Sequence, residues 1–423
     1  MQTAEASTVD IISSLPEAIL CHILSFATTK EAVATSVLSK RWIHLWNHVN
    51  NLNFPDIKVY SDRCSLSFNE FVYSLLFDRE AVGYNVINGF SLDIQYHYAD
   101  LARRLGLHNI TKWINLAVKS KLKYLRLRLS TYDLDYYIDV RYGYAKLPVS
   151  IFTCRTLVSL DLRCFSFEGF TFTGFSSFPS LKVLRLEYFK FSKFRDFLLF
   201  IAGCPILEVL QIYRTEFLPL EEDSLTLKEF KILSLPKLTR ADLYGFRSQC
   251  FPVNALSTAK YLCIDTLKVH RWYKVNRMQH PYDVVPIFHN LTHLELHNRW
   301  DLVVQVLHQC PKLQNLTLYK YGYEDGDYQE NWVEPEFVPQ CLLSSLRNFT
   351  IHHDLSDLQK ELMLEQYILK NARILQTMTI RCMTKEPKTE RTLSMCPVAS
   401  ATCQITFERH SYLCTHDVYA HMM

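Results

Sequence analysis

The sequence is poor in glycine, and its glycines form no phosphate-binding loop. There are 10 glycines in 423 residues, and neither a G-x-G-x-x-G pattern nor a P-loop pattern occurs. Both patterns need glycine where the backbone closely approaches a phosphate. The composition therefore argues against a Gly-rich phosphate-binding loop.

Long apolar runs are also missing, as is the pattern of a leader peptide. No apolar stretch approaches the length of about 18 residues that marks a membrane-spanning helix. Residues 1–10 lack the basic segment and the following apolar run of a secretory signal peptide. We therefore expect an intracellular protein, cytoplasmic and/or nuclear, that does not bind a membrane.

Neither sign of charge is in clear excess, and the cysteines are not arranged in metal-binding or redox pairs. The 46 basic and 43 acidic residues leave a formal net charge of +3, which gives no overall attraction to nucleic acid. Thirteen cysteines are an odd number and include no C-x-x-C pair, which is typical of reduced, buried thiols. None lies in a catalytic signature. We therefore predict a protein that is not an enzyme and carries no cofactor or metal.

Helical periodicity is what the sequence does have, and it starts near the N-terminus. Between residues 11 and 49, apolar residues recur at the spacing of three short helices. Side chains suited to cap such helices stand before each of them. The expected caps are the pairs Ser14/Glu17 and Thr28/Glu31, and Ser39 for the third helix.

This segment has more large apolar side chains than it can bury. Chains below about 40 residues seldom close a core alone, and amphipathic helices often dock on a partner protein. The alternative is a helical cap on the rest of the chain, and periodicity does not separate the two interpretations. The apolar candidates for partner binding are Leu15, Pro16, Ile19, Leu20, Ile23, Leu24, Val37, Leu38, Trp42, Leu45 and Trp46.

The same segment resembles an F-box. Leu15-Pro16, the run ILSF at 23–26, the run AVATSVLSKRW at 32–42 and Leu45-Trp46 stand where that family places them. Ala27-Thr28 departs from the Leu-Pro that is usual between the first two helices. The resemblance implies that the apolar residues named above bind the Skp adaptor of a ubiquitin ligase, and through it a cullin.

Downstream, the sequence predicts further elements and then an internal repeat. A helix is expected over Phe68–Phe77, a strand over Phe90–Ile94 and a helix over Trp113–Val118. The motif apolar-x-x-apolar-x-apolar then recurs, mostly 20 to 35 residues apart. Its copies are centred on Leu125, Leu160, Leu184, Leu210, Phe230, Ala241, Leu262, Leu294, Leu316, Phe349 and Met378.

These spacings are typical of leucine-rich repeats with insertions, in which strand-plus-return units stack into a curved solenoid. The near-duplicates CPILEVLQI and CPKLQNLTL, which begin at Cys204 and Cys310, fix the register. The copies at Phe230 and Ala241 lie too close together for both to be strands of the main sheet. Strand alternation predicts that the repeated apolar residues point inward and the residues between them point to the concave face.

Two groups on this predicted face are candidate sites. Arg126, Arg128, Arg163 and Arg185 could grip an acidic or phosphorylated target. The alternative is ordinary surface charge, offset by acidic neighbours. His293, Glu295 and His297 alternate on one strand, but a metal would need a further ligand and a supporting shell, so solvated surface is the favoured interpretation. His352-His353-Asp354 is a weaker candidate of the same kind.

The C-terminal part resembles an FBD domain, most specifically in the runs YILKNA at 367–372 and CQITF at 403–407. We predict an F-box at 8–54, a leucine-rich-repeat solenoid at 55–330 and an FBD domain at 331–410. The expected fold is α/β: a short three-helix F-box, a curved repeat solenoid and a C-terminal FBD cap.

The resemblances together imply a substrate-recognition subunit of a Skp–cullin–F-box ubiquitin ligase, whose repeats bind a target protein that the sequence does not identify. Two alternatives stay open: a non-ligase leucine-rich-repeat scaffold, and a small-molecule receptor within such a ligase.

Overall fold

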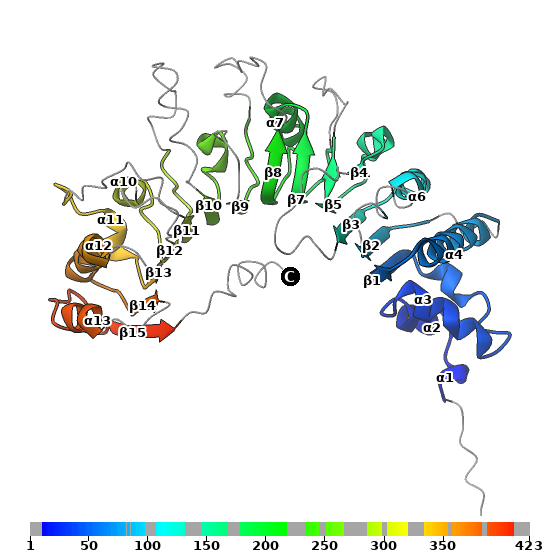
Figure 1. Cartoon of the computed structure of the whole chain (residues 1–423), viewed down its shortest axis with the longest axis horizontal. Helices are drawn as coiled ribbons and strands as arrows, with labels where there is room; N and C mark the ends of the chain where they lie inside the picture. The colour runs from blue at the N-terminus through cyan, green and yellow to red at the C-terminus, as the bar shows by residue number, and fades with distance from the viewer. Residues whose placement is uncertain are drawn as a thin grey trace, which may run out of the picture. The chain divides into compact units, whose positions relative to one another are not determined.

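The computed structural model is described here for the residues whose placement is defined. These are residues 11–81, 83–84, 86–97, 101, 107–131, 145–167, 178–217, 233–244, 251–265, 286–297, 303–319, 334–353, 358–382 and 387–409. The chain divides into two compact units, Met1–Cys204 and Pro205–Met423. Both units combine parallel strands with helices (Figure 1), which agrees with the α/β class.

The N-terminal segment is helical, but only one of the three expected caps is confirmed and the third helix is not an α-helix. It contains α1 (Ile11–Ser14), α2 (Glu17–Leu24) and α3 (Thr29–Ala34), followed by the 3₁₀ turns η1 (Thr35–Val37) and η2 (Leu45–His48). Residues 40–44 form turns, so the expected helix after Ser39 is wrong.

The Thr28/Glu31 capping box is confirmed. The Glu31 amide donates to Thr28 Oγ1 at 3.3 Å, and the Thr28 amide donates to Glu31 Oε2 at 2.8 Å. The equivalent prediction for Ser14 is wrong because Pro16 takes the N-cap position of α2. The Ser14 hydroxyl instead donates to the Ile11 carbonyl at 2.6 Å, within α1.

The first unit is a parallel sheet whose strands follow chain order. Its strands are β1 (Asn51–Val59), β2 (Gly89–Tyr96), β3 (Tyr124–Thr131), β5 (Ser159–Arg163) and β7 (Val183–Phe191), with short β4 (Ala145–Lys146) and β6 (Phe165–Ser166) beside them. The connections include α4 (Asp62–Ala81), α6 (Leu107–Lys119), the 3₁₀ helix η6 (Val149–Thr153) and α7 (Phe194–Ala202). The helices and the strand predicted ahead of the repeats are therefore confirmed.

The second unit continues the same strand-and-return pattern. Its strands are β8 (Val209–Phe217), β9 (Arg240–Tyr244), β10 (Tyr261–Asp265), β11 (His293–His297), β12 (Asn315–Tyr319), β13 (Asn348–His353), β14 (Thr377–Cys382) and β15 (Gln404–Arg409), all parallel. The returns include η7 (Val253–Leu256), α10 (Val303–His308), α11 (Gln340–Ser344), α12 (Leu358–Asn371) and α13 (Pro387–Ser394). The motif at Ala241 is strand β9, whereas the one at Phe230 lies outside the described residues.

A repeated hydrogen-bond pattern sets the register between neighbouring strands. At the start of β10, the amides of Lys260 and Tyr261 both donate to the Thr239 carbonyl, at 2.8 and 3.1 Å. At the start of β11, the next two amides donate in the same way to the Lys260 carbonyl, at 2.9 and 3.1 Å. Because each strand begins at the same point, equivalent residues of successive repeats lie side by side.

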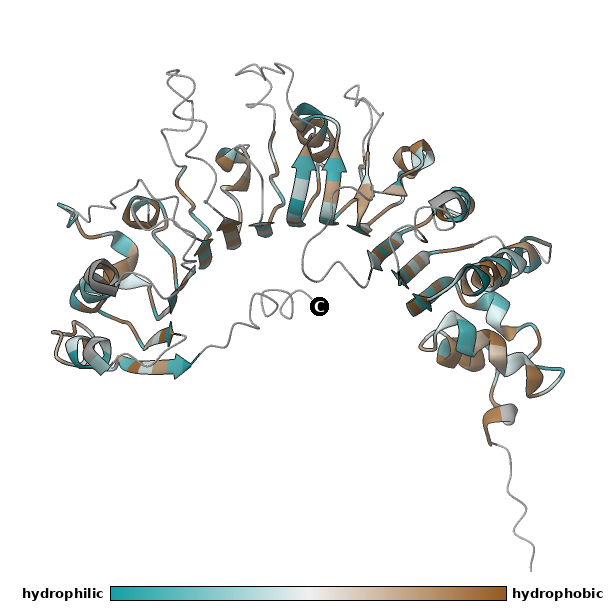
Figure 2. Cartoon of the chain, viewed as in Figure 1, coloured by the Kyte–Doolittle hydropathy of each residue, from teal (hydrophilic) through white to brown (hydrophobic). Residues whose placement is uncertain are grey.

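This register stacks the repeated leucines into a buried core. Leu262, Leu294 and Leu316 are direct neighbours across β10, β11 and β12, and each is at most 2% exposed. Apolar and polar residues alternate along strands such as β1, β2 and β3 in Figure 2. The prediction that these leucines point inward is confirmed. The residues between them form rows on the opposite face of the sheet, away from α10, α11 and α12 (Figure 1).

The matching Cys-Pro motifs occupy equivalent buried positions. Cys204 follows α7 and Cys310 follows α10, and both side chains are 0% exposed. Burial raises the pKa of both thiols to about 12. They therefore pack as small apolar groups, as the sequence predicts. Among the helices of the described residues, none combines the length and apolar content needed to cross a membrane.

Candidate functional site

About half of the apolar candidates in the N-terminal segment are buried within the chain itself. Leu20, Leu24, Trp42, Leu45 and Trp46 are all at most 8% exposed. They form the interior of the segment, so they are not at the surface that a partner would meet in this structure. Their role in partner binding stays a prediction. Because they are buried, they would act indirectly, by holding the fold of the segment that displays the exposed residues.

The other candidates are exposed to an unusual degree for large apolar side chains. Val37 is 85% exposed, Leu38 64%, and Ile19 and Ile23 45% each. Phe26, at 79%, was missed by the selection from sequence, although Ile19, Ile23 and Phe26 follow the i, i+4, i+7 spacing of one helix face. These five residues are called the exposed apolar set below. Pro16 is also exposed and Leu15 is half-buried.

The N-terminal segment is tied to the first strand and to α4 by buried polar contacts. Arg79 of α4 is only 2% exposed and donates to the carbonyls of Val49 at 2.9 Å, Val86 at 3.0 Å and Trp46 at 3.5 Å. Burial lowers the pKa of its guanidinium to about 10. The Asn53 amide of β1 donates to Thr29 Oγ1 at 2.6 Å. The exposed apolar set is therefore displayed on a segment with defined contacts to the sheet.

The four candidate arginines lie on neighbouring strands of the first unit, in two rows. Arg126, Asp161 and Arg185 are aligned across β3, β5 and β7. In the next row, Arg128 and Arg163 are aligned with Glu187. The structure thus brings the arginines together, and it places carboxylates among them.

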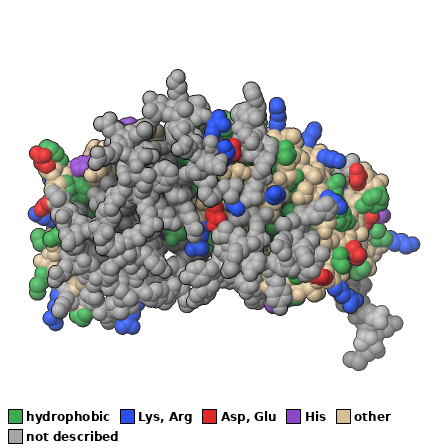
Figure 3. All heavy atoms as spheres, turned by 45° about the horizontal axis from the view of Figure 1, so that its top comes forward, with side chains coloured by type: hydrophobic (Ala, Val, Ile, Leu, Met, Phe, Trp, Pro, Cys, Tyr) green, Lys and Arg blue, Asp and Glu red, His purple; other side chains and the backbone are tan. Residues whose placement is uncertain are grey.

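These carboxylates offset much of the positive charge of the arginines by forming ion pairs with them. Arg128 Nη2 lies 3.2 Å from Asp161 Oδ2, and Arg126 Nε lies 3.7 Å from the same oxygen. Arg163 Nη1 lies 3.7 Å from Glu187 Oε1. The Arg126 side chain keeps 50% exposure, so it is the arginine of these three most open to a ligand. On the face drawn in Figure 3, basic and acidic side chains of the described residues are likewise interspersed.

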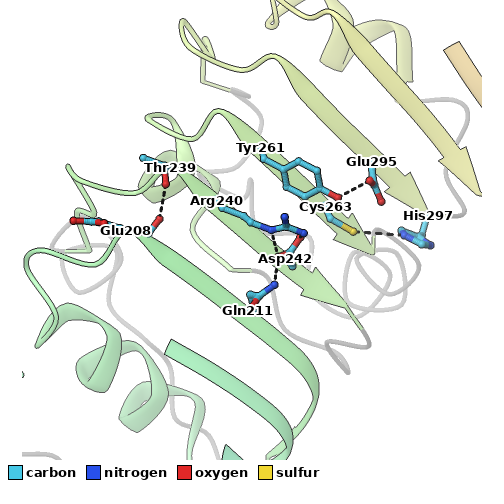
Figure 4. A network of polar contacts seen from close by, with 9 residues as sticks. All are labelled: Glu208, Gln211, Thr239, Arg240, Asp242, Tyr261, Cys263, Glu295 and His297. Carbon is cyan, nitrogen blue, oxygen red and sulfur yellow. Dashed lines mark hydrogen bonds and ion pairs between the residues drawn. The ribbon is translucent and has the colours of Figure 1, made fainter. Parts of the chain in front are cut away.

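A second polar cluster crosses β8 to β11 in the second unit (Figure 4). Asp242 is 1% exposed and accepts from Gln211 Nε2 at 2.7 Å and from Arg240 Nε at 2.8 Å. The guanidinium carbon of Arg240 lies 4.1 Å from the centre of the Tyr261 ring. Tyr261 in turn donates its hydroxyl to Glu295 Oε1 at 2.5 Å. The cluster therefore links four strands through side chains that sequence reasoning did not connect.

His297 is central to this face and corrects one expectation. The sequence favoured solvated surface for His293, Glu295 and His297, and that is wrong for His297, which is 0% exposed. Its ring stacks on Tyr319 with centres 4.3 Å apart and planes 2° apart, and meets the edge of Tyr244 at 5.0 Å. Burial lowers the pKa of His297 to about 3, so the ring is neutral at pH 7.

Cys263 joins Glu295 and His297 in a possible metal-ligand group. This group differs from the one considered from sequence, which had His293 in place of Cys263. Cys263 Sγ lies 3.6 Å from His297 Nε2. One atom each from Cys263, Glu295 and His297 lie within 4.8 Å of one another. His293 is exposed and hydrogen-bonds instead with Asn315 Nδ2 at 2.9 Å. The register of β10 on β11 places Cys263 opposite Glu295, as their equal positions in the repeat motif imply, and packing brings His297 beside Cys263.

Family models match three parts of the chain. The model for the F-box domain matches residues 12–54. A model described as the LRR repeats of FBD-associated F-box protein At5g56370 matches residues 110–235. The FBD model matches residues 334–380. Each matched range lies within one of the three domains expected from sequence. The exact bounds of those domains stay a prediction.

Known proteins of Arabidopsis thaliana are similar along most of the chain. F-box/FBD/LRR-repeat protein At4g00160 is 31% identical, over 88% of this chain and 86% of that protein. F-box/FBD/LRR-repeat protein At1g78750 is 29% identical, over 94% of this chain and 96% of that protein. F-box/LRR-repeat protein 13 is 29% identical, over 90% and 91%. Each of these similarities extends over most of this chain and most of the relative.

Proposed function

The chain belongs to the F-box/FBD/LRR-repeat protein family, and on this basis we propose that it is the substrate-recognition subunit of a Skp–cullin–F-box ubiquitin ligase. In this role the N-terminal segment docks on the Skp adaptor, which connects it to a cullin, and the repeats hold a target protein. The chain performs no bond chemistry. It holds its target near the enzyme that carries ubiquitin, which raises the effective concentration of the reacting groups.

The single observation that carries this proposal is the exposed apolar set on the F-box segment. Five large apolar side chains, from 45% to 85% exposed, sit within 20 residues of sequence. Clustered apolar exposure marks a protein interface. Val37 and Leu38 are direct neighbours in sequence, while Ile19, Ile23 and Phe26 share one face of α2 and its C-terminal turn. We assign the adaptor contact to these residues, with Leu15 and Pro16 beside them.

The target would bind the sheet face that carries the polar rows. Arg126, at 50% exposure, is the arginine best placed to exchange its partner Asp161 for an acidic group of the target. In this proposal the target identity is open, and the arginine rows favour a negatively charged or phosphorylated segment. The FBD part, with α11, β13, α12, β14, α13 and β15, would end the repeat array and shield its last core layer.

Co-purification from cells tests the ligase role against the non-ligase scaffold. The tagged full chain should recover both the Skp adaptor and a cullin, and Leu38→Asp should lose both because it places a charge in an apolar contact. The matched control is Phe77→Asp in α4, since Phe77 is an apolar residue of similar exposure, 70%, outside the F-box segment. We expect this control to recover both partners.

Two results would contradict the ligase role. One is a wild-type chain that recovers its target but no adaptor or cullin, which would favour the scaffold. The other is equal recovery by the wild-type chain and Leu38→Asp. Thermal melting of all three chains checks that the folded state is preserved, as expected for substitutions at exposed positions.

A further inference from the structure

The cluster on β10 and β11 has the composition of a metal site. Cys263 supplies a sulfur, His297 an imidazole nitrogen and Glu295 a carboxylate oxygen, and these atoms lie within 4.8 Å of one another. They come from two adjacent strands whose register is fixed by paired backbone hydrogen bonds. Ligand atoms held on paired strands keep their spacing, which favours metal binding over a chance encounter of flexible side chains.

The spacing of the two nearest ligand atoms fits a tetrahedral zinc ion. Zinc binds cysteine sulfur at about 2.3 Å and histidine nitrogen at about 2.0–2.1 Å, which puts the two ligand atoms about 3.5 Å apart in a tetrahedron. Cys263 Sγ and His297 Nε2 are 3.6 Å apart. A zinc ion can therefore bind both atoms with little movement of either side chain.

The surroundings orient two of the ligands, as is usual around protein-bound metals. The His297 ring is held flat against Tyr319 and edge-on to Tyr244, which directs Nε2 toward Cys263. The Tyr261 hydroxyl donates to one oxygen of Glu295, which fixes the carboxylate beside Cys263 (Figure 4).

Charge balance supports a divalent ion of intermediate softness. A cysteine thiolate and a glutamate carboxylate carry two negative charges, which a divalent cation neutralises, so the loaded site brings no net charge into a largely buried position. Mixed sulfur, nitrogen and oxygen ligands suit zinc, whereas magnesium and calcium prefer oxygen alone.

We propose that Cys263, Glu295 and His297 bind a zinc ion on the sheet face of the second unit, with water in the fourth position. Glu295 is half-buried, whereas Cys263 and His297 are buried, so the carboxylate is the ligand with access to solvent. Binding releases the thiol proton of Cys263 to solvent, because the thiolate is the ligand. The site goes beyond the proposed ligase function and does not depend on it.

Zinc and cobalt binding by the intact chain test this site. The full-length protein is stripped with a chelator, given one equivalent of Zn²⁺, desalted and analysed for metal by mass spectrometry. We expect about one zinc per chain in the wild type and loss of that zinc in Cys263→Ser and Glu295→Gln. With Co²⁺, the wild type should show a sulfur-to-cobalt charge-transfer band that is absent in Cys263→Ser. Tyr261→Phe should bind about 10- to 100-fold more weakly, since it removes a supporting hydrogen bond.

Two control variants separate this site from adventitious binding. Cys64→Ser removes an exposed cysteine, and His293→Asn removes the exposed histidine two residues from Glu295 on β11. Both should bind zinc like the wild type. Glu295→Gln keeps the shape of a half-buried side chain, so it stays informative if Cys263→Ser does not fold. The proposal is overturned if the wild type takes up no zinc, if Glu295→Gln retains full affinity, or if the cobalt–sulfur band survives in Cys263→Ser.

Discussion

Replacing Arg79 should loosen the attachment of the F-box segment to the first strand. Its guanidinium is 2% exposed and donates hydrogen bonds of 2.9 and 3.0 Å to the carbonyls of Val49 and Val86. Hydrogen bonds from a charged group contribute about 1.5–3 kcal/mol each, and a buried carbonyl left without a donor costs about 1–3 kcal/mol. Arg79→Met removes both donors, so we expect the free energy of local opening to fall by about 3–5 kcal/mol.

Hydrogen exchange followed by mass spectrometry measures this opening without assuming that the whole chain unfolds in one step. A loss of about 3–5 kcal/mol corresponds to exchange roughly a hundredfold to several thousandfold faster. The increase should be confined to residues 45–59 and to the Asn88 amide, which donates to the Asn50 carbonyl at 2.8 Å. Arg79→Lys should give a smaller change, because one ammonium can still reach one carbonyl. Arg63→Met, an exposed arginine of the same helix, is the control. Unchanged exchange over residues 45–59 in Arg79→Met would refute the reasoning.

Three further predictions rest on single contacts. Thr28→Ala should lower the free energy of unfolding by about 1 kcal/mol, which calorimetry would record as a lower Tm. Ser14→Ala should lower it less, because Ser14 caps no helix. Equal effects of the two substitutions would argue against the capping assignment. Iodoacetamide near pH 8 should label Cys64 before Cys204, because a hydrogen bond from Ser61 lowers the pKa of exposed Cys64 while burial raises the pKa of Cys204 to about 12. Equal labelling, read by peptide mass spectrometry, would contradict this. Arg126→Gln should weaken target capture in a pull-down with little change in Tm, and exposed Lys58→Gln is the control. Undiminished capture would remove the arginine from the target site.

Sequence reasoning predicted the repeats well because their pattern is local. A strand with one buried face must alternate apolar and polar residues, so Leu294 and Leu296 could be assigned to the core from sequence alone. The Cys-Pro motifs at Cys204 and Cys310 marked equivalent positions for the same reason. Each repeat contacts its neighbours in one register, so a pattern found once applies along the array.

The misses concern contacts between residues far apart in sequence. The repeat motif places Cys263 and Glu295 at the same position, directly after the centres Leu262 and Leu294. Nothing in the sequence shows that His297 is buried and lies beside the Cys263 sulfur, because that contact is set by packing. Amphipathic spacing could not tell Trp42, which is buried in its own segment, from Leu38, which is exposed, since both patterns read as apolar. The capping signal at Ser14 failed because Pro16 starts α2 in the same place.

The affinity of the full chain for the Skp adaptor tests the central claim most directly. It can be measured by isothermal titration with the wild type, with Val37→Ala combined with Leu38→Ala, and with Phe77→Ala as the control. Apolar hot-spot residues cost about 2 kcal/mol or more each when truncated, so the double variant should bind at least about a hundredfold more weakly even if the two losses add only in part. The control should bind like the wild type. Equal affinity of all three chains, or no binding by the wild type, would contradict the claim that this protein is the substrate receptor of a ubiquitin ligase.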